Sequence, residues 1–136
     1  MFPFETSVRL YDTDAAGVLF FGNYFKIAHD AYETFMESID YSLRHVIEQA
    51  ASLLLIVHSE ADFKKEMRTG EKVLVQLRLE KLGKTSFTLS YALVNARGDI
   101  AATLKTVHVA VDKNSRRSVE LPRKLREGLS RLSPAG

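Results

Sequence analysis

The sequence predicts an α+β domain in which one long amphipathic helix packs against a curved five-stranded antiparallel sheet. Apolar residues recur every three or four positions between Tyr24 and Ile39, which is the pattern of a helix with one buried face. Later segments alternate apolar and polar residues and are separated by short glycine-containing turns, a pattern typical of antiparallel strands. Because the sheet is the only predicted surface large enough to bury the helix face, the two must pack together.

The long helix is expected from Asn23 to Ser38, with Asn23 as its N-cap residue. Its apolar stripe consists of Tyr24, Ile27, Ala28, Ala31, Tyr32, Phe35, Met36 and Ile39. A short second helix is expected from Leu43 to Gln49, capped by Ser42. A third short helix is expected at 122–132, because a proline opens that segment.

The first strand is expected from Thr6 to Tyr11, where Val8 and Leu10 alternate with polar residues. Four long strands are expected after the helices, at Leu53–Phe63, Val73–Glu80, Phe87–Leu93 and Leu104–Asp112. Short turns that contain glycine separate these four strands, so we expect a meander in which each strand pairs with the next.

Length and composition limit the class of protein. A chain of 136 residues without linkers or repeats is expected to form one domain, 1–136. The net charge of +2 is too small to indicate a nucleic-acid partner, and no apolar stretch approaches membrane-spanning length. The absence of cysteine excludes disulfides and thiolate nucleophiles, and it fits a cytoplasmic location. No signal peptide is evident at the N-terminus.

The four histidines do not indicate a metal site. None of them pairs with another histidine at ligand spacing, and the nearby carboxylates form no metal motif. We therefore expect no metal and no cofactor. His58 is the histidine with the strongest functional case, because it follows an apolar run and is placed to line a pocket.

The loop from Asp12 to Gly22 is the candidate for chemistry, because it brings an acidic residue to the start of the long helix. Backbone N–H groups are unpaired at a helix start, and the helix dipole favours negative charge there. Asp14 is a candidate nucleophile or general base. Residue type alone favours a loop aspartate that caps a turn. Asp12 is expected to be structural, as an acceptor for loop backbone donors.

The segment from Asp12 to Tyr24 resembles the signature of the hotdog-fold acyl-CoA thioesterases of the 4-hydroxybenzoyl-CoA thioesterase family. That signature has an acidic pair, a glycine, an apolar run and an asparagine–tyrosine pair at the helix start. The resemblance covers nearly the whole chain up to about Asp112. It implies a hotdog fold, a long central helix wrapped by the antiparallel sheet, which agrees with the order of elements expected above.

Two further segments are similar to the 1,4-dihydroxy-2-naphthoyl-CoA hydrolases of quinone biosynthesis. They are His29–Glu33 and Val57–Phe63. Phe21 occupies a position where one branch, the Tol-Pal-linked short-chain thioesterases, has histidine, and where the 4-hydroxybenzoyl-CoA branch has an aromatic residue. The resemblance thus points to an aromatic acyl group.

The resemblance also implies roles for individual residues. Asp14 matches the catalytic carboxylate, and the N–H of Phe21 would bind the thioester oxygen. The oxyanion and substrate-binding set is Gly17, Phe21, Gly22, Asn23, Tyr24 and His58. A weaker coenzyme A site is expected at Lys81, Lys84 and Thr85, where solvated turn lysines are an equally good interpretation.

The resulting hypothesis is hydrolysis of an acyl-CoA thioester to the free acid and coenzyme A, with 1,4-dihydroxy-2-naphthoyl-CoA as the best single substrate. This reaction belongs to menaquinone or phylloquinone biosynthesis. Two alternatives stay open: a general short- or medium-chain acyl-CoA thioesterase, and a non-catalytic acyl-binding protein on the same scaffold. Members of the family are dimers or tetramers with active sites at subunit interfaces, and an open sheet edge invites pairing with a second copy. We therefore expect a homo-oligomer, in particular a homotetramer built from dimers.

Overall fold

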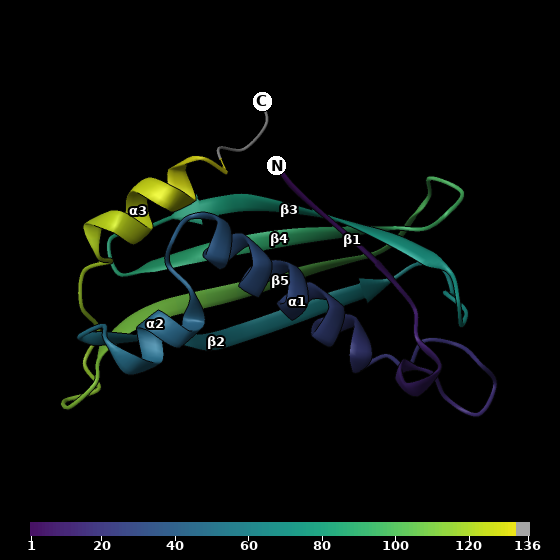
Figure 1. Cartoon of the computed structure of the whole chain (residues 1–136), viewed down its shortest axis with the longest axis horizontal. Helices are drawn as coiled ribbons and strands as arrows, with labels where there is room; N and C mark the ends of the chain where they lie inside the picture. The colour runs from purple at the N-terminus through teal and green to yellow at the C-terminus, as the bar shows by residue number, and fades with distance from the viewer. Residues whose placement is uncertain (133–136) are drawn as a thin grey trace.

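The computed structural model describes residues 1–132. Its elements in chain order are β1 (Phe2–Ser7), η1 (Leu10–Asp12), α1 (Asn23–Ser38), α2 (Leu43–Glu48), β2 (Ser52–Phe63), β3 (Lys72–Leu82), β4 (Ser86–Val94), β5 (Ile100–Asp112) and α3 (Arg123–Ser130). The α+β class and the bounds of α1 are as predicted (Figure 1). The third helix is shorter than 122–132, with Pro122 as its N-cap residue. No helix in residues 1–132 is both long and apolar enough to cross a membrane.

The five strands form one antiparallel sheet in the order β1-β3-β4-β5-β2. The predicted meander is right for β3, β4 and β5 but wrong for β2, which pairs with β5 at the far edge. The reason lies in the segment between β2 and β3, which is too long and too well bonded to act as a hairpin. Lys64 N–H donates to Ala101 O, and Leu19 N–H donates to Met67 O, so this segment leads the chain across the sheet to β3, which lies between β1 and β4.

The first strand lies earlier than predicted. The expected strand at Thr6–Tyr11 is wrong, because β1 ends at Ser7 and the chain then turns through η1. Phe2 and Phe4, on alternate positions of β1, pack against the core, whereas Leu10 is 73% exposed. The apolar alternation that places the strand therefore begins at Phe2.

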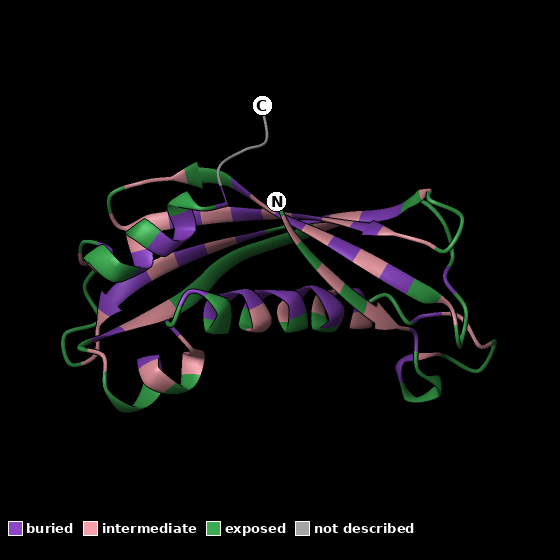
Figure 2. Ribbon diagram, turned by 45° about the horizontal axis from the view of Figure 1, so that its top comes forward, coloured by how far each residue is buried: buried purple, intermediate pink, exposed green. Residues whose placement is uncertain are grey.

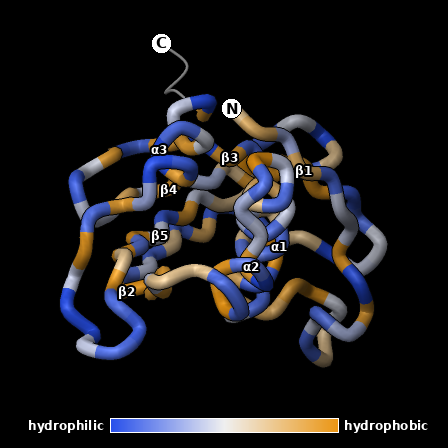
Figure 3. Tube along the Cα trace, turned by 60° about the vertical axis from the view of Figure 1, so that its left-hand side comes forward, coloured by the Kyte–Doolittle hydropathy of each residue, from blue (hydrophilic) through white to orange (hydrophobic). Residues whose placement is uncertain are grey.

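The apolar face of α1 is buried against the concave side of the sheet. Residues at the three-to-four spacing, including Tyr24, Ala31 and Phe35, are almost fully buried, as is Ile39 just beyond the helix. The strands form an arc around α1 (Figure 3), and buried residues alternate with half-buried ones along β3 and β4 (Figure 2). Each fully buried large apolar side chain contributes roughly 1.5–3 kcal/mol, so this face holds the helix in place.

The two short helices are fixed by local signals. Ser42 caps α2 as predicted, since its Oγ accepts a hydrogen bond from His45 N–H at 3.1 Å. Leu125 and Leu129 of α3 are buried, and Gly128 lies directly against Ile39. α3 thus covers one end of the sheet, while η1 and the loop after it lie at the opposite end (Figure 1).

Candidate active site

Asp14 lies in a tight loop that is closed by its own backbone. Asp14 N–H donates to Val18 O at 2.9 Å, and Gly17 N–H donates to Asp14 O at 3.0 Å. The Asp14 carboxylate is exposed, and its Oδ1 accepts from Ala16 N–H at 2.8 Å and from Val18 N–H at 3.3 Å. Its Oδ2 has no hydrogen-bond partner within residues 1–132. One oxygen therefore holds the carboxylate in place, and the other is available to a ligand.

Gly17 makes the turn of this loop possible. Its φ of +75° lies in the left-handed region that side-chain-bearing residues rarely adopt. Its carbonyl accepts from Thr69 N–H at 3.1 Å, which joins the loop to the segment before β3. Gly17 thus gives the Asp14 loop its shape.

Asp12 anchors the loop to α1. Its carboxylate is buried and pairs with Lys26 Nζ at 2.7 Å, and its carbonyl accepts from Asn23 Nδ2 at 2.9 Å and from Phe20 N–H at 3.1 Å. Asp12 is thus structural, as expected: its carbonyl accepts a hydrogen bond from the loop backbone, whereas its carboxylate binds Lys26. The hydrogen bond to Asp12 raises the pKa of Lys26.

The start of α1 differs from the predicted cap. Asn23 is the first helical residue and Gly22 is the N-cap, because the Asn23 side chain is bonded to the Asp12 carbonyl rather than to the helix. The backbone N–H groups of Phe21 and Gly22 have no acceptor within the described part of the chain. Two free donors therefore lie at the positive end of the helix dipole, in the loop that holds Asp14.

An aromatic cluster covers this helix start. Phe21 packs on Phe20 and on Phe63 of β2, with ring centroids 4.6 Å and 6.5 Å apart, and Tyr24 lies 4.8 Å from Phe63. Tyr24 is buried, and this burial, with Glu66 and Glu71 nearby, raises the pKa of its hydroxyl. Phe21 and Phe63 remain 62% and 49% exposed. The predicted residues Phe21 and Tyr24 thus form an apolar surface around the free N–H groups.

A cavity of about 360 Å³ lies between α1 and β2. Its lining consists of Phe25, Lys26, His29, Asp30, Ile56, Ser59, Tyr91 and Thr106. None of these residues was predicted from the sequence to line a pocket, although His29 lies in one of the segments that carried the resemblance. Tyr91 and Thr106 could not be found from sequence spacing, because they come from strands far from the helix along the chain.

His58 lies outside this cavity in the single chain. It follows a β-bulge in β2 and its Nε2 lies 3.2 Å from Glu60 Oε1, with the His58 side chain 58% exposed. Ile56 and Ser59 line the cavity instead. The bulge shifts the register between Ile56 and His58, and such a shift changes which side chains of a strand share a face.

The predicted coenzyme A residues lie at the other end of the sheet. Lys84 and Thr85 form the β3–β4 turn, and this turn is fastened to α3 because Arg126 Nη2 donates to Gly83 O at 2.7 Å and to Lys84 O at 3.1 Å. Lys81 lies at the end of β3. Within one chain the structure therefore does not bring these residues to Asp14 (Figure 1).

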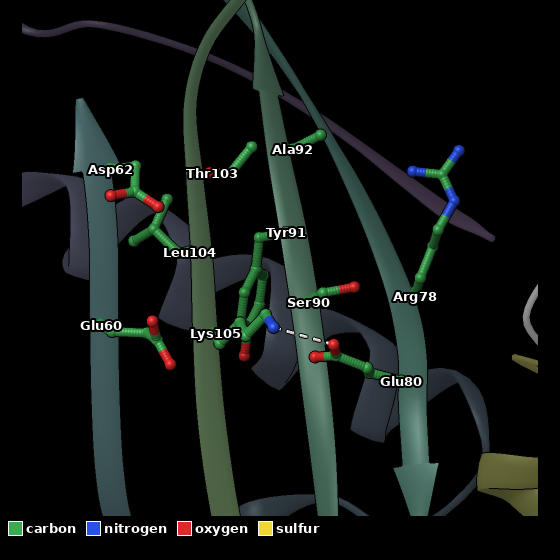
Figure 4. Close-up of a pocket in the computed structure, with 10 residues that line it drawn as sticks. All are labelled: Glu60, Asp62, Arg78, Glu80, Ser90, Tyr91, Ala92, Thr103, Leu104 and Lys105. Carbon is green, nitrogen blue, oxygen red and sulfur yellow. Dashed lines mark ion pairs between the residues drawn. The ribbon is translucent and has the colours of Figure 1, made fainter. Parts of the chain in front are cut away.

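The convex face of the sheet carries a second hollow, of about 340 Å³ (Figure 4). Charged side chains from three strands surround it, among them Glu60, Arg78 and the pair Lys105 Nζ–Glu80 Oε1 at 2.8 Å. The Asp14 loop contributes no residue to this hollow. The Asp14 loop does not line the cavity beside α1 either, but that cavity is lined by Phe25 and Lys26 from the beginning of α1, and Lys26 is paired with Asp12 of the loop.

Comparison with known proteins agrees with this geometry. The model of the thioesterase-like superfamily matches residues 8–129. The chain is 36% identical over 121 residues to the 1,4-dihydroxy-2-naphthoyl-CoA hydrolase of Nostoc punctiforme, covering 89% of this chain and 81% of the relative. It is 32% identical over 131 residues to the enzyme of the same name from Rippkaea orientalis, covering 95% of each chain.

A solved structure supports the same relationship. The crystal structure of Slr0204, a 1,4-dihydroxy-2-naphthoyl-CoA thioesterase from Synechocystis, superposes with a TM-score of 0.91 at 30% sequence identity, covering 96% of each chain. The sequence match and the shared hotdog fold together show that this chain belongs to the thioesterase-like superfamily.

Proposed function

We propose that this thioesterase hydrolyses 1,4-dihydroxy-2-naphthoyl-CoA, a step of quinone biosynthesis, to the free acid and coenzyme A. The observation that carries the proposal is Asp14, which has one carboxylate oxygen held by the loop and one oxygen free, in the same loop that leads to the free N–H groups of Phe21 and Gly22. The names of the relatives supply the acyl group. The proposed compartment is the cytoplasm.

The helix start polarises the thioester. With the carbonyl oxygen directed at the N–H groups of Phe21 and Gly22, negative charge that develops on this oxygen meets two preorganised donors. Loss of one such donor costs about 3 kcal/mol in other enzymes of this chemistry. The loop therefore supplies the electrostatic part of catalysis through backbone atoms.

Asp14 supplies the nucleophile or the base. In one route its free oxygen attacks the carbonyl carbon, coenzyme A leaves as a thiolate that takes up a proton, and water then hydrolyses the acyl–aspartate anhydride. In the other route Asp14 accepts a proton from water as the water oxygen attacks, and this proton passes to the leaving sulfur. Both routes return Asp14 as a carboxylate, and neither needs a metal or a cofactor.

The cavity beside α1 is suited to a planar acyl group. The cavity lies on the side of α1 that faces β2, and Phe25 and Ile56 form its apolar walls. Sites of this kind bind apolar ligands through such walls and orient them through a few polar groups. An aromatic acyl group in this cavity would have its thioester end directed to the helix start.

The active site is proposed to be completed by a second copy of the chain. β2 is a long edge strand with exposed apolar residues, including Leu55, Ile56 and Val57, and an edge of this kind tends to pair with another strand. Antiparallel pairing of β2 with β2 of a second copy would reverse that copy end to end. The end of the sheet that carries Lys81, Lys84 and Thr85 would then lie on the side of the first copy's Asp14, with His58 close to the interface. A dimer, or a tetramer of such dimers, is the proposed assembly.

The test is steady-state hydrolysis of a panel with the wild-type protein and Asp14→Asn. The panel contains 1,4-dihydroxy-2-naphthoyl-CoA, 4-hydroxybenzoyl-CoA, benzoyl-CoA, and a short and a long aliphatic acyl-CoA. We expect kcat/KM to be highest for the naphthoyl thioester, and Asp14→Asn to lower turnover by about 10²–10⁴-fold because the carboxylate is lost. Circular dichroism should show an unchanged fold.

Each alternative has its own outcome in this experiment. Highest kcat/KM for an aliphatic thioester would replace the aromatic substrate with the general acyl-CoA thioesterase. Full activity of Asp14→Asn would remove Asp14 from the mechanism. Binding of acyl-CoA without turnover by the wild-type protein would favour the acyl-binding alternative.

A further inference from the structure

A chain of three polar side chains runs through the apolar core between the sheet and α1. Tyr91 Oη lies 2.7 Å from Thr106 Oγ1, and Thr106 Oγ1 lies 2.7 Å from His108 Nε2. The three residues are 2%, 7% and 0% exposed. Burial of polar groups costs free energy unless they are hydrogen-bonded. The presence of these three hydrogen-bonded side chains in an apolar core therefore suggests a functional role.

His108 is held as a neutral ring at the inner end of the chain. Its ring stacks on that of Phe87, with the ring centroids 4.7 Å apart and an angle of 3° between the planes, and its centroid lies 4.5 Å from that of the Tyr32 ring. Burial, with a smaller effect of His29, lowers the pKa of His108 to about 3. Its Nδ1 is buried without a hydrogen-bond partner in the described residues.

The neutral ring sets the direction of every hydrogen bond in the chain. A proton on Nδ1 would leave a buried N–H unpaired, which proteins avoid more strictly than an unpaired acceptor. The proton of His108 is therefore on Nε2 and is donated to Thr106 Oγ1. Thr106 in turn donates its O–H to Tyr91 Oη, and the hydrogen of the Tyr91 hydroxyl remains available to another acceptor.

Tyr91, whose hydroxyl carries this hydrogen, lines the cavity beside α1 as well as the hollow on the convex face. Tyr91 and Thr106 both line the cavity, and the Tyr91 hydroxyl is the part of its side chain that reaches β5, on the side of β2. The charged lining residues Lys26 and Asp30 are exposed, so they lie toward solvent, whereas Tyr91 is buried. Burial also raises the pKa of Tyr91, which keeps its hydroxyl protonated.

We propose that the Tyr91 hydroxyl recognises an oxygen substituent on the ring of the acyl group, and that Thr106 and His108 are positioning residues that direct its hydrogen into the cavity. This inference rests on the proposed function, and it adds the residue that distinguishes a hydroxylated aromatic acyl group from an unsubstituted one. A site built to hydrogen-bond a polar group discriminates against ligands that lack the group, because its donor is then left unpaired.

The test compares 1,4-dihydroxy-2-naphthoyl-CoA with 2-naphthoyl-CoA, which has the same ring system without the hydroxyl groups. Tyr91→Phe should lower kcat/KM about tenfold for the hydroxylated thioester and leave it unchanged for 2-naphthoyl-CoA. Thr106→Val should show the same pattern with a smaller loss, about threefold, because Tyr91 then keeps its hydroxyl but loses its orientation. If Tyr91→Phe does not fold, the kcat/KM values of Thr106→Val for the two thioesters test the proposal in its place. Tyr41→Phe, another buried tyrosine that is not in the cavity lining, is the matched control and should change neither rate.

A binding measurement separates the two proposals. In the Asp14→Asn background, calorimetry compares binding of 1,4-dihydroxy-2-naphthoic acid, kept under argon, with binding of 2-naphthoic acid. A preference for the hydroxylated acid that Tyr91→Phe abolishes supports the role of Tyr91, even if no aryl-CoA is hydrolysed, in which case the proposed function alone fails. Equal losses for both ligands, no loss in the variant, or no binding of the hydroxylated acid would overturn the inference.

Discussion

Two carboxylates only two residues apart do different work in this loop. Asp12 is buried and its carboxylate is bonded to Lys26, which also lies 4.6 Å from the centre of the Tyr11 ring. Asp14 is exposed, with one oxygen held by backbone N–H groups and one free. At the scale of the residue, the difference in hydrogen-bond partners assigns anchoring to Asp12 and makes Asp14 available for chemistry.

A buried neutral histidine also makes stability depend on pH. The pKa of His108 is about 3 in the folded chain and about 6.5 when unfolded, so below pH 6.5 only the unfolded state takes up this proton. Stability that is present above pH 6.5 is thus lost as the pH falls toward 3. Between pH 7 and 5 we expect the free energy of unfolding to fall by about 2 kcal/mol from this group.

Urea unfolding of the wild-type protein and of His108→Gln at several values between pH 7 and 5 measures this effect. The variant should lose most of the dependence, since glutamine does not titrate. His58→Gln, which replaces an exposed histidine, should retain it. An unchanged pH dependence in His108→Gln would show that another group is responsible.

At the scale of the element, α3 is held against the end of α1 by the absence of a side chain at Gly128. A Cβ atom at this position would lie 2.5 Å from Ile39 Cδ1 and 2.8 Å from Ile39 Cβ. Gly128→Ala should therefore destabilise the fold by about 1–3 kcal/mol, although alanine is the better helix former.

The measurement is thermal and urea unfolding, with Ser130→Ala as the control on the exposed face of α3. The control should change stability little. Ile39→Val removes the Cδ1 contact and should recover part of the loss in the double variant. A Gly128→Ala protein as stable as the wild type would mean that α3 adjusts its position freely.

At the scale of the whole molecule, the candidate site is divided between the two ends of the sheet. The Asp14 loop lies at one end, and the β3–β4 turn with Lys84 lies at the other, fastened to α3 through Arg126. One chain places these groups at opposite ends of its sheet, and the proposed pairing of two chains through β2 would bring them to one substrate. The assembly is thus expected to be necessary for full activity.

Val57→Lys tests this expectation, because Val57 is a 60% exposed residue on the edge strand and a lysine there opposes edge pairing. Light scattering should show a smaller assembly than for the wild type, and kcat/KM should fall at least tenfold. Ile47→Lys, which places the same charge on an exposed residue of α2, should keep the assembly and the activity. A wild-type monomer, or an active Val57→Lys monomer, would contradict the shared site.

The sequence predicted well those features that depend on near neighbours along the chain. The helix Asn23–Ser38, the cap at Ser42 and the hairpins of β3, β4 and β5 follow from residue spacing and turn residues. The Asp12–Tyr24 motif also predicted the family, because such a motif is a short local pattern that sequence alone contains.

The tertiary structure decided which distant residues meet. Period-two alternation shows which face of a strand is buried but not which strand lies beside it, so the pairing of β2 with β5 could not be derived from it. The salt bridge between Asp12 and Lys26, the displaced cap at Asn23, and the contact of Tyr91 with Thr106 likewise need the packed helix and sheet. The sequence by itself thus determined the fold class, most of the elements, the family and the candidate carboxylate, since these are local patterns. Only the folded chain determined the cavity and its polar lining, since these are made by residues that become neighbours through packing.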